Sequence, residues 1–386
     1  MIRIQAELPT GIDWYFTDMK NNLRHHMTRL ALLFCILVAV AGCGEFVSSK
    51  DDEVSIGKAQ KLELFLSEDN LMRLYSSVAI SDSVSCSVIY EKWRGEGKIK
   101  VRGYTSRMHS KKSFQLKIDG KKYVLERGDE VAGISNRIAM RAQQLAGLPA
   151  CDTETVGLFL NDEYLGCYNL ITYYDEDILG GELYKAYFKD YDNMENNHPL
   201  RSLCEKKFPE DDDFSNLENL LAAVTSTLDN NAKWQEWVNK NVDIEKVASY
   251  LAVHDFLMVE DTFMTNLYIA YNKKFYLLPW DNESCIGYNE KGYDMGGDNQ
   301  LTKRLVAVPE VKAAYNRRMK ELFMDDGILS TLKADTEKMF AAADTAMKND
   351  PNFTDGYDKY LKTKERFLKF LSSAGRVSHL TDPVLP

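Results

Sequence analysis

The spacing of apolar residues changes along the chain, and this change limits the folds that the chain can adopt. In the first half, apolar and polar residues alternate over short runs bounded by Gly, Asn and Asp, which is typical of β-strands and hairpins. From Asp213 onward, apolar residues recur every three or four positions, which predicts helices. Asn266–Trp280 interrupts this helical half with two short runs joined at Asn272-Lys273, which predicts a hairpin. The pattern as a whole predicts an α+β fold.

Turn residues mark the ends of the expected elements. Gly95–Gly97, Asp119-Gly120 and Asn161-Asp162 are expected to turn hairpins. A helix is expected to begin at Ser135, as its N-cap, and to stop at Gly147–Pro149. The expected strands of the first half are the runs 62–67, 83–91, 98–103, 113–118, 121–126, 155–161 and 163–174. The expected helices of the second half are the runs 217–228, 244–251, 310–323, 332–347 and 358–371.

Composition narrows the class of partner. The chain has 386 residues, of which 45% are hydrophobic and 27% are charged, as in ordinary globular proteins with a substantial core. The net charge of −10 predicts no nucleic-acid partner, because non-specific binding to nucleic acid needs a basic surface. The six histidines lack metal-ligand spacing and the seven cysteines contain no CxxC pair.

The N-terminal region has the features of an export signal. Met27-Thr28-Arg29 precedes an apolar run, Leu30–Ala41, that is too short to span a bilayer. The sequence "VAGC", Val40–Cys43, then resembles a bacterial lipobox, which implies cleavage before Cys43 and lipidation of its thiol. Residues 27–42 are therefore expected to be a lipoprotein signal, and residues 1–26 an over-extended start. The alternative is a buried N-terminal helix.

The expected mature protein starts with a polar tether. Residues 43–55, with the run "SSKDDE", are expected to link the lipid to a domain over residues 56–386. The protein is then expected to be exported and lipid-anchored to the bacterial cell envelope, on its periplasmic or surface face. Five cysteines remain in this domain, and we interpret them mainly as small buried apolar residues. They are Cys86, Cys151, Cys167, Cys204 and Cys285.

Polar residues bracket the interior hairpin in an order that protein-kinase-like enzymes share. Asp261 and Asn266 stand before the hairpin, and Asp281 follows it. In such enzymes one carboxylate accepts the proton of a substrate hydroxyl, while an amide and a second carboxylate hold the metal ions on the nucleotide phosphates. The hairpin returns the chain, so that Asn266 and Asp281 can converge. As a bare pattern this order is weak evidence, and the alternative is that Asp261 caps a turn and Asn266 starts a strand.

Three segments together resemble the CotH family, the spore coat protein H kinases. They are "VRGYTSRMHSKKSFQLKI" (Val101–Ile118), "LFLNDEYLGCYNL" (Leu158–Leu170) and "DTFMTNLYIAYNKKFYLLPWDNESCIG" (Asp261–Gly287). The resemblance implies an atypical two-lobed protein-kinase-like fold, with an N-lobe over about 56–180 and a C-lobe over about 181–386, and with ATP bound between them.

The resemblance also implies roles for individual residues. Asp261 would be the catalytic base, and Asn266 and Asp281 would hold Mg²⁺ or Mn²⁺. Glu283 stands where the family has a second acid, and its longer side chain would still reach the metal.

The basic residues of the first motif are expected to contact the nucleotide. The lysines of this motif would face the phosphates, and Arg102 in its R-G motif is a further candidate. Lys111 and Lys117 are expected to share one face of a strand because they are an even number of residues apart, whereas Lys112 points the other way. The alternative for each lysine is a solvated surface charge.

The chain departs from the family pattern at one acid in particular. The family often has a glutamate where this chain has Thr172, and that glutamate would pair with the nucleotide-positioning lysine. If the pair is needed, another acid must supply it, such as Asp175 or Glu176. No G-x-G-x-x-G loop is present, so the "RGYTSR" segment would have to cover the phosphates.

Three classes of function follow. The first is Mg²⁺-dependent phosphoryl transfer from ATP to a hydroxyl of a protein Ser or Thr, or of another cell-surface acceptor. The second is a catalytically inactive CotH-like surface protein that binds a partner or has a structural role. The third is a metal-assisted hydrolase that would use Asp211–Asp213, although this run is explained more simply as a solvated loop before a helix.

Overall fold

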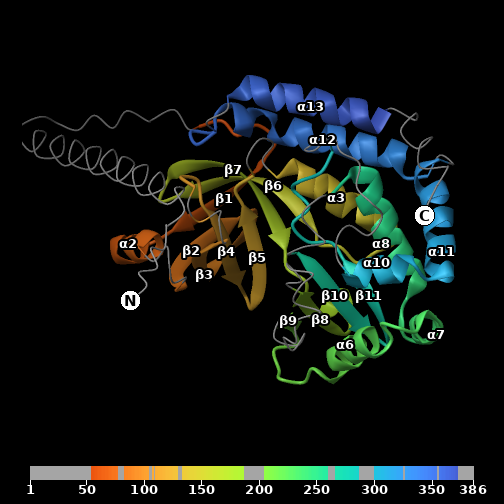
Figure 1. Ribbon diagram of the computed structural model, residues 1–386. Helices are drawn as coiled ribbons and strands as arrows, with labels where there is room; N and C mark the ends of the chain where they lie inside the picture. The colour runs from red at the N-terminus through yellow and green to blue at the C-terminus, as the bar shows by residue number, and fades with distance from the viewer. Residues whose placement is uncertain are drawn as a thin grey trace, which may run out of the picture. The chain divides into compact units, whose positions relative to one another are not determined.

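A computed structural model describes the chain in segments between Val54 and Ser372 (Figure 1). All of them belong to the compact unit that begins at Val54. No helix among these residues is long and apolar enough to cross a membrane. The predicted lipidation site, Cys43, and the predicted catalytic base, Asp261, lie outside the described residues. The described segments are residues 54–76, 82–103, 107, 109–128, 133–186, 204–259, 266–286, 300–324, 327–353 and 356–372.

The first strands close into a barrel in the order β1-β2-β3-β4-β5-β7-β6. β1 pairs with β6 in parallel, and the other neighbours are antiparallel. Alternate side chains such as Leu62, Leu116 and Leu158 point inward and form the barrel core. The strands are β1 (Gln60–Phe65), β2 (Val84–Tyr90), β3 (Trp93–Arg102), β4 (Ser113–Ile118), β5 (Lys121–Glu126), β6 (Thr153–Leu160) and β7 (Glu163–Thr172).

Two of the three expected hairpin turns are confirmed, and one is wrong. Residues of positive φ turn the chain at Asp119-Gly120 and at Asn161-Asp162, as two-residue hairpins require. The expected turn at Gly95–Gly97 is instead inside β3, and the chain turns before it, next to Glu91. A Cβ atom on Gly95 would lie 2.7 Å from the Trp93 ring. This glycine therefore serves a close approach inside a strand and not a turn.

A second sheet has four strands in the order β11-β10-β8-β9. β10 (Leu267–Asn272) and β11 (Lys274–Leu278) form the expected hairpin, with Lys273 at positive φ in the turn. β8 (Glu182–Ala186) pairs with β10, and β9 (Cys204–Phe208) pairs with β8. Sequence analysis missed β8 and β9, because each is only five residues long and neither alternates cleanly.

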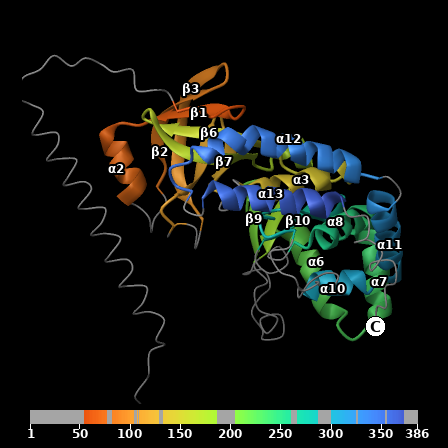
Figure 2. The ribbon, with the colours of Figure 1, turned by 90° about the horizontal axis from the view of Figure 1, so that it is seen from above.

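Helices fill the second half, so the predicted α+β class with a β-rich first half is confirmed. α3 begins at Ile134 with Gly133 as its N-cap, and not at the expected Ser135. Figures 1 and 2 show α12 and α13 side by side, and α12 packs on α3, β6 and β7. The helices are α2 (Glu68–Ser76), α3 (Ile134–Leu145), α4 (Glu176–Leu179), α6 (Ser215–Ser226), α7 (Asn231–Asn241), α8 (Ile244–Leu257), α10 (Gln300–Val306), α11 (Pro309–Phe323), α12 (Leu329–Lys348) and α13 (Tyr357–Ser372).

The buried thiols bear out the interpretation of the cysteines as packing residues. Cys86, Cys151, Cys167 and Cys285 are buried without a disulfide. Burial raises the pKa of the Cys86 thiol to about 12, because the thiolate would lose its hydration. This cysteine is therefore an unreactive apolar side chain.

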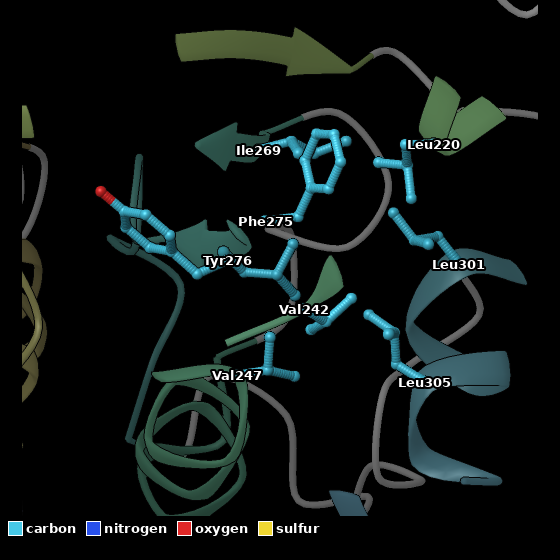
Figure 3. A pocket seen from close by; sticks show the side chains of 9 residues that line it. Leu220, Val242, Val247, Ile269, Phe275, Tyr276, Leu301 and Leu305 are labelled. Atoms are coloured by element: carbon cyan, nitrogen blue, oxygen red, sulfur yellow. The ribbon is translucent and has the colours of Figure 1, made fainter. Parts of the chain in front are cut away.

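Apolar packing fixes the β10–β11 hairpin against the helices behind it. Figure 3 shows Ile269 and Phe275 of the hairpin pointing toward Leu220 of α6 and toward Leu301 and Leu305 of α10. The space left among these side chains is about 10 Å³, which is no more than one water molecule needs. This part of the core therefore holds the hairpin in place and does not bind a ligand.

Shortening a side chain in this packing is expected to destabilise the protein. Ile269 is buried, and Ile269→Ala should lower the free energy of unfolding by about 2–5 kcal/mol, because a cavity replaces three carbon atoms. Urea unfolding followed by circular dichroism measures the loss. The exposed Leu228 provides the matched control, since Leu228→Ala should change stability by less than about 1 kcal/mol. Equal losses in the two variants would contradict the packing described here.

Candidate functional site

Three carboxylates meet where β5 ends and where the chain leaves β11. Glu126 is the last residue of β5, and Asp281 and Glu283 follow β11. One carboxylate oxygen from each residue lies within 4.8 Å of the others. Glu126 is buried, Asp281 is half-buried and Glu283 is exposed, so the group extends from the interior to the surface. The structure thus brings together two predicted residues, Asp281 and Glu283, and adds Glu126.

Two amides hold the Glu126 carboxylate. Asn136 of α3 donates from Nδ2 to Oε1 over 3.0 Å, and Asn169 of β7 donates from Nδ2 to Oε2 over 2.9 Å. Gly133 covers this arrangement, since a Cβ atom there would lie 2.6 Å from Glu126 Oε2 and from Asn169 Cβ. The positive φ and the bare backbone of Gly133 are therefore both needed for α3 to begin this close to the carboxylate.

The environment of Glu126 favours its protonated form. Burial and, to a smaller extent, the negative charge of Asp281 raise its pKa to about 7, against the opposing effect of the two amides and of Arg102. Two carboxylates this close repel each other when both are ionised. A cation bound between them would remove that repulsion.

Aromatic packing positions the segment that carries Asp281. The Trp280 ring lies 5.0 Å from the Tyr173 ring and 5.3 Å from the Tyr268 ring, centroid to centroid. The Tyr174 hydroxyl donates to the Pro279 carbonyl over 2.8 Å. Asp281 itself adopts φ of 56°, a left-handed conformation that aspartate tolerates better than most residues. The packing thus holds Asp281 in a backbone conformation that aims its side chain at Glu126.

A buried polar chain fixes the next residue. The Asn282 backbone amide donates to Asn136 Oδ1 over 3.2 Å, and Asn282 Oδ1 lies 3.2 Å from His254 Nε2. His254 Nδ1 lies 2.8 Å from Gln143 Nε2. Burial lowers the pKa of His254 to about 4, so this histidine is neutral near pH 7. Asn136 therefore links Glu126 to the segment of Asp281, and α8 supports that link through a neutral histidine.

Two cationic side chains lie beside the acids. Arg102, at the end of β3, places its guanidinium 5.6 Å from the centre of the Trp280 ring and lowers the pKa of Glu126. Lys185 of β8 lies near Asp281. Burial lowers the pKa of this lysine, and the negative charge of Asp281 opposes part of that shift. Both cations could therefore form charge-assisted hydrogen bonds with a phosphate group bound next to the carboxylates.

Asn266 lies at the same end of the hairpin as Asp281. It directly precedes β10 and is buried, with 6% of its surface exposed. Tyr268 pairs with Leu278, so this register, continued past the strand ends, sets Asn266 opposite Trp280, the residue that precedes Asp281 in the chain. The hairpin therefore returns the chain in the way that the sequence predicts.

The two lysines predicted to face a nucleotide lie in different settings. The expectation that they share one strand face is wrong, because Lys111 precedes β4, which begins at Ser113. The Lys111 ammonium is buried and lies 2.7 Å from Asp350 Oδ2 and 2.7 Å from the Cys167 carbonyl oxygen. Lys117 is exposed on the outer face of β4. Lys111 thus already has a carboxylate partner, between the barrel and the loop that joins α12 to α13.

Thr172, at the position of the missing family glutamate, and Asp175 both make local contacts in the structure. Thr172 donates from Oγ1 to the Asp152 carbonyl over 2.9 Å. Asp175 accepts from the Ile178 amide over 3.2 Å and so caps α4. The buried acid at the site is instead Glu126, from another strand.

Sequence analysis missed Glu126 and Lys185. Glu126 had one usable signal, since it is an acid that ends a predicted strand, "KKYVLE". Its partners come from two other elements, and nothing local in the sequence indicates them. Lys185 had no such signal, because β8 was not predicted.

The donor set fits a hard divalent cation. Carboxylate oxygens are the ligands that Mg²⁺ and Mn²⁺ prefer, and three of them converge here. Within the described part of the chain, Asn169 Oδ1 is buried without a hydrogen-bond partner, next to the amide nitrogen that binds Glu126. Glu126, Asp281 and Glu283 are therefore the residues that would hold such an ion.

A family model described as CotH kinase protein matches residues 99–374. This range includes the three carboxylates, Arg102 and Lys185. None of the curated proteins compared with the chain matches it.

The raised pKa of Glu126 predicts how stability changes with pH. The folded protein binds this proton more tightly than the unfolded chain, so the contribution of Glu126 is full below about pH 4.5 and is lost as the pH rises through about 7. We expect Glu126→Gln to remove this loss, which amounts to about 3 kcal/mol at most. Urea unfolding without divalent ions, at about pH 5 and about pH 8, measures the difference.

The matched control is Glu337→Gln, which changes an exposed glutamate and should keep the wild-type pH dependence. Mg²⁺ or Mn²⁺ should raise the melting temperature of the wild-type protein at about pH 8, where Glu126 is ionised, and not that of Glu126→Gln. A wild-type protein whose stability is constant over this range would contradict the assigned pKa.

Breaking the buried Lys111–Asp350 ion pair is expected to destabilise the protein more than breaking an exposed ion pair. Asp350→Ala leaves the ammonium buried without a carboxylate and should lower the free energy of unfolding by about 3–5 kcal/mol. The double variant Lys111→Met/Asp350→Leu should lose less, because no charge stays buried. Lys338→Ala, which breaks an exposed ion pair, should cost less than about 1 kcal/mol. Thermal unfolding of the three variants tests this, and an Asp350→Ala loss as small as that control would refute it.

Proposed function

Because the chain belongs to the CotH kinase protein family, we propose that it catalyses metal-dependent phosphoryl transfer from ATP to a hydroxyl group. The acceptor is a Ser or Thr side chain of a protein, or another hydroxyl at the cell surface. The barrel forms an N-terminal lobe, the second sheet with the helices forms a C-terminal lobe, and the nucleotide binds between them. The observation that supports this proposal most directly is that the carboxylates of Glu126, Asp281 and Glu283 lie close together.

The described residues of the site have two roles. Glu126, Asp281 and Glu283 hold Mg²⁺ or Mn²⁺, with Asn266 next to them in the hairpin register. The bound ion neutralises charge on the phosphates and orients them for in-line transfer. Arg102 and Lys185 bind phosphate oxygens, since both cations lie beside the acids.

The remaining roles rest on the family pattern. Asp261 accepts the proton of the attacking hydroxyl, as its position before Asn266 implies. Lys111 is not assigned to the nucleotide in this proposal, because it already binds Asp350. Lys117 lies on the outer face of β4 and has no assigned role in the transfer step.

We also propose that the protein acts outside the cytoplasm. Cys43 would carry a lipid that anchors the domain to the cell envelope through the 43–55 tether. The acceptor would then be a protein or polymer of the envelope. Mass spectrometry of Cys43 in protein isolated from membranes tests this part separately.

A second candidate function is a catalytically inactive binding or structural protein of the envelope. Two observations favour it: Thr172 replaces an acid common in the family, and Lys111 binds Asp350 instead of a residue at the carboxylate site. An inactive protein could still bind nucleotide. Phosphoryl transfer, and not binding alone, therefore distinguishes the two functions.

The metal role of Asp281 predicts a specific loss. ATP with Mg²⁺ should raise the melting temperature of the wild-type protein, since a ligand that binds only the folded state stabilises it by about 2.7 kcal/mol at 100 times its Kd. Asp281→Asn should lose this shift and all transfer of radiolabelled phosphate, while its circular dichroism stays unchanged. Asp212→Asn, in the exposed loop before α6, should behave as wild type. Transfer that persists in Asp281→Asn would refute the metal role.

The base role of Asp261 predicts a different pattern. Asp261→Asn should keep the thermal shift with ATP and Mg²⁺ but lower the transfer rate by roughly 100-fold to 10,000-fold, because the hydroxyl proton has no acceptor. A normal rate would remove Asp261 from this role. No thermal shift in the wild-type protein, and no transfer, would favour the inactive binding protein.

A further inference from the structure

Three lysines face one another in register on the outer face of the barrel. Lys98 of β3 pairs with Lys117 of β4, and Lys117 pairs with Lys122 of β5. Their side chains lie on the outer face, since the inward positions of β4 are taken by Phe114 and Leu116. We call Lys98, Lys117 and Lys122 the lysine row.

The lysine row is unfavourable for the isolated protein. Like charges directly opposite each other on neighbouring strands destabilise a sheet. The row is also a local basic patch in a chain whose net charge is −10. Lys122 forms an ion pair with Glu210. No ion pair within 4.0 Å joins Lys98 or Lys117 to an acid among the described residues, although Glu210 lies near enough for Lys122 and, to a smaller extent, Lys117 to lower its pKa. An anionic ligand on this face would offset the repulsion between the lysines.

The basic surface continues along β3 to the carboxylate site. Lys98, Lys100 and Arg102 alternate with the inward side chains of Ile99 and Val101, so all three point outward. A strand rises about 3.3 Å per residue, so Lys98 lies about 13 Å from Arg102. Arg102 is the cation beside Glu126 at the candidate site. The lysine row is therefore joined to the site by one strand.

An acidic side chain occurs at the other end of the same face. Glu96, which precedes Lys98 on the outer face of β3, accepts from the Ser87 hydroxyl over 2.8 Å. The positive charge thus extends from the lysine row toward the site and not along the whole barrel.

We propose that this surface, Lys98, Lys100, Lys117 and Lys122 with Arg102 at its end, binds an acidic peptide segment of the phosphoacceptor. This inference rests on the proposed function. The acceptor hydroxyl lies at the carboxylate site, and acidic residues about four to six positions away lie on the lysine row, because an extended peptide rises by about the same distance per residue as β3 does. The substrate class is therefore a Ser or Thr near a run of Asp or Glu.

A peptide fits this surface better than a membrane does. The outward side chains of an extended peptide repeat every second residue, about 6.6 Å apart, as Lys98, Lys100 and Arg102 do along β3. The cations also end at the carboxylates, so the bound chain is aligned with the place of reaction. A flat anionic membrane would use neither the spacing nor the direction. Binding to anionic vesicles is therefore the competing outcome.

Peptide binding tests the surface without any turnover. The probe is a fluorescein-labelled peptide with one Ser and a run of Glu about four residues from it, and the reference peptide has Gln in place of each Glu. Fluorescence anisotropy of the wild-type protein should show tighter binding of the Glu peptide, weakened by salt as charged contacts are. Lys98→Glu/Lys117→Glu should weaken it by about tenfold or more.

The control variant is Lys240→Glu/Lys320→Glu, which reverses two exposed lysines on α7 and α11. It should bind the Glu peptide as wild type does. The lysine-row variant should melt close to wild type, because it keeps one pair of like charges, between β3 and β4, and replaces the other, between β4 and β5, by opposite charges. Equal binding of the two peptides, or equal losses in the two variants, would overturn the proposal. So would a lysine-row variant that loses only its binding to phosphatidylglycerol vesicles.

The thermal shift with ATP and Mg²⁺ separates this inference from the proposed function. The lysine-row variant should keep that shift and should raise the KM for the Glu peptide without a matching loss of kcat, because the row binds the peptide away from the reacting atoms. Glu-peptide binding that depends on the row, in a protein without the ATP shift, would support the surface and refute the kinase activity. An ATP shift with no preference for the Glu peptide would do the reverse.

Discussion

The buried carboxylate of Glu126 is the constraint on which the arrangement of the site depends. A charge at this depth needs hydrogen-bond donors, and they come from Asn136 on α3 and from Asn169 on β7. Asn136 also accepts from the Asn282 amide, so the same side chain fixes the segment that carries Asp281. One amide thus ties the end of β5 to the chain beyond the β10–β11 hairpin.

The site contains two buried titratable side chains, Glu126 and His254, whose pKa values shift in opposite directions. The amides satisfy the carboxylate, while burial and Asp281 raise its pKa to about 7. His254 has the reverse problem, since burial lowers its pKa to about 4 and leaves it neutral. The site thus keeps a neutral ring where a second charge would be costly, and crowds negative charge only where a cation can bind. Electrostatic crowding of this sort is more typical of functional sites than of packing cores.

The sequence predicted those parts of the fold that depend on local pattern. Asp119-Gly120 and Asn161-Asp162 turn as expected because their backbone conformations need residues of their kind. The turn predicted at Gly95 was wrong, because this position lacks a side chain to make room for the ring of Trp93 and not to form a turn. Asp281 was found because the residues before it form a recognisable hairpin. Glu126 was not, because its partners lie 10 and 43 residues away and only the folded chain brings them together.

The way in which the barrel closes has a consequence for how the chain folds. Gln60 of β1 pairs with Val156 of β6, and Lys111 beside the barrel pairs with Asp350, which is 239 residues later. Contacts between such distant residues form late, since the loop between them must lose its freedom first. The barrel can therefore close only after β7, which ends at Thr172, and its link to Asp350 forms only after α12 has been added to the chain.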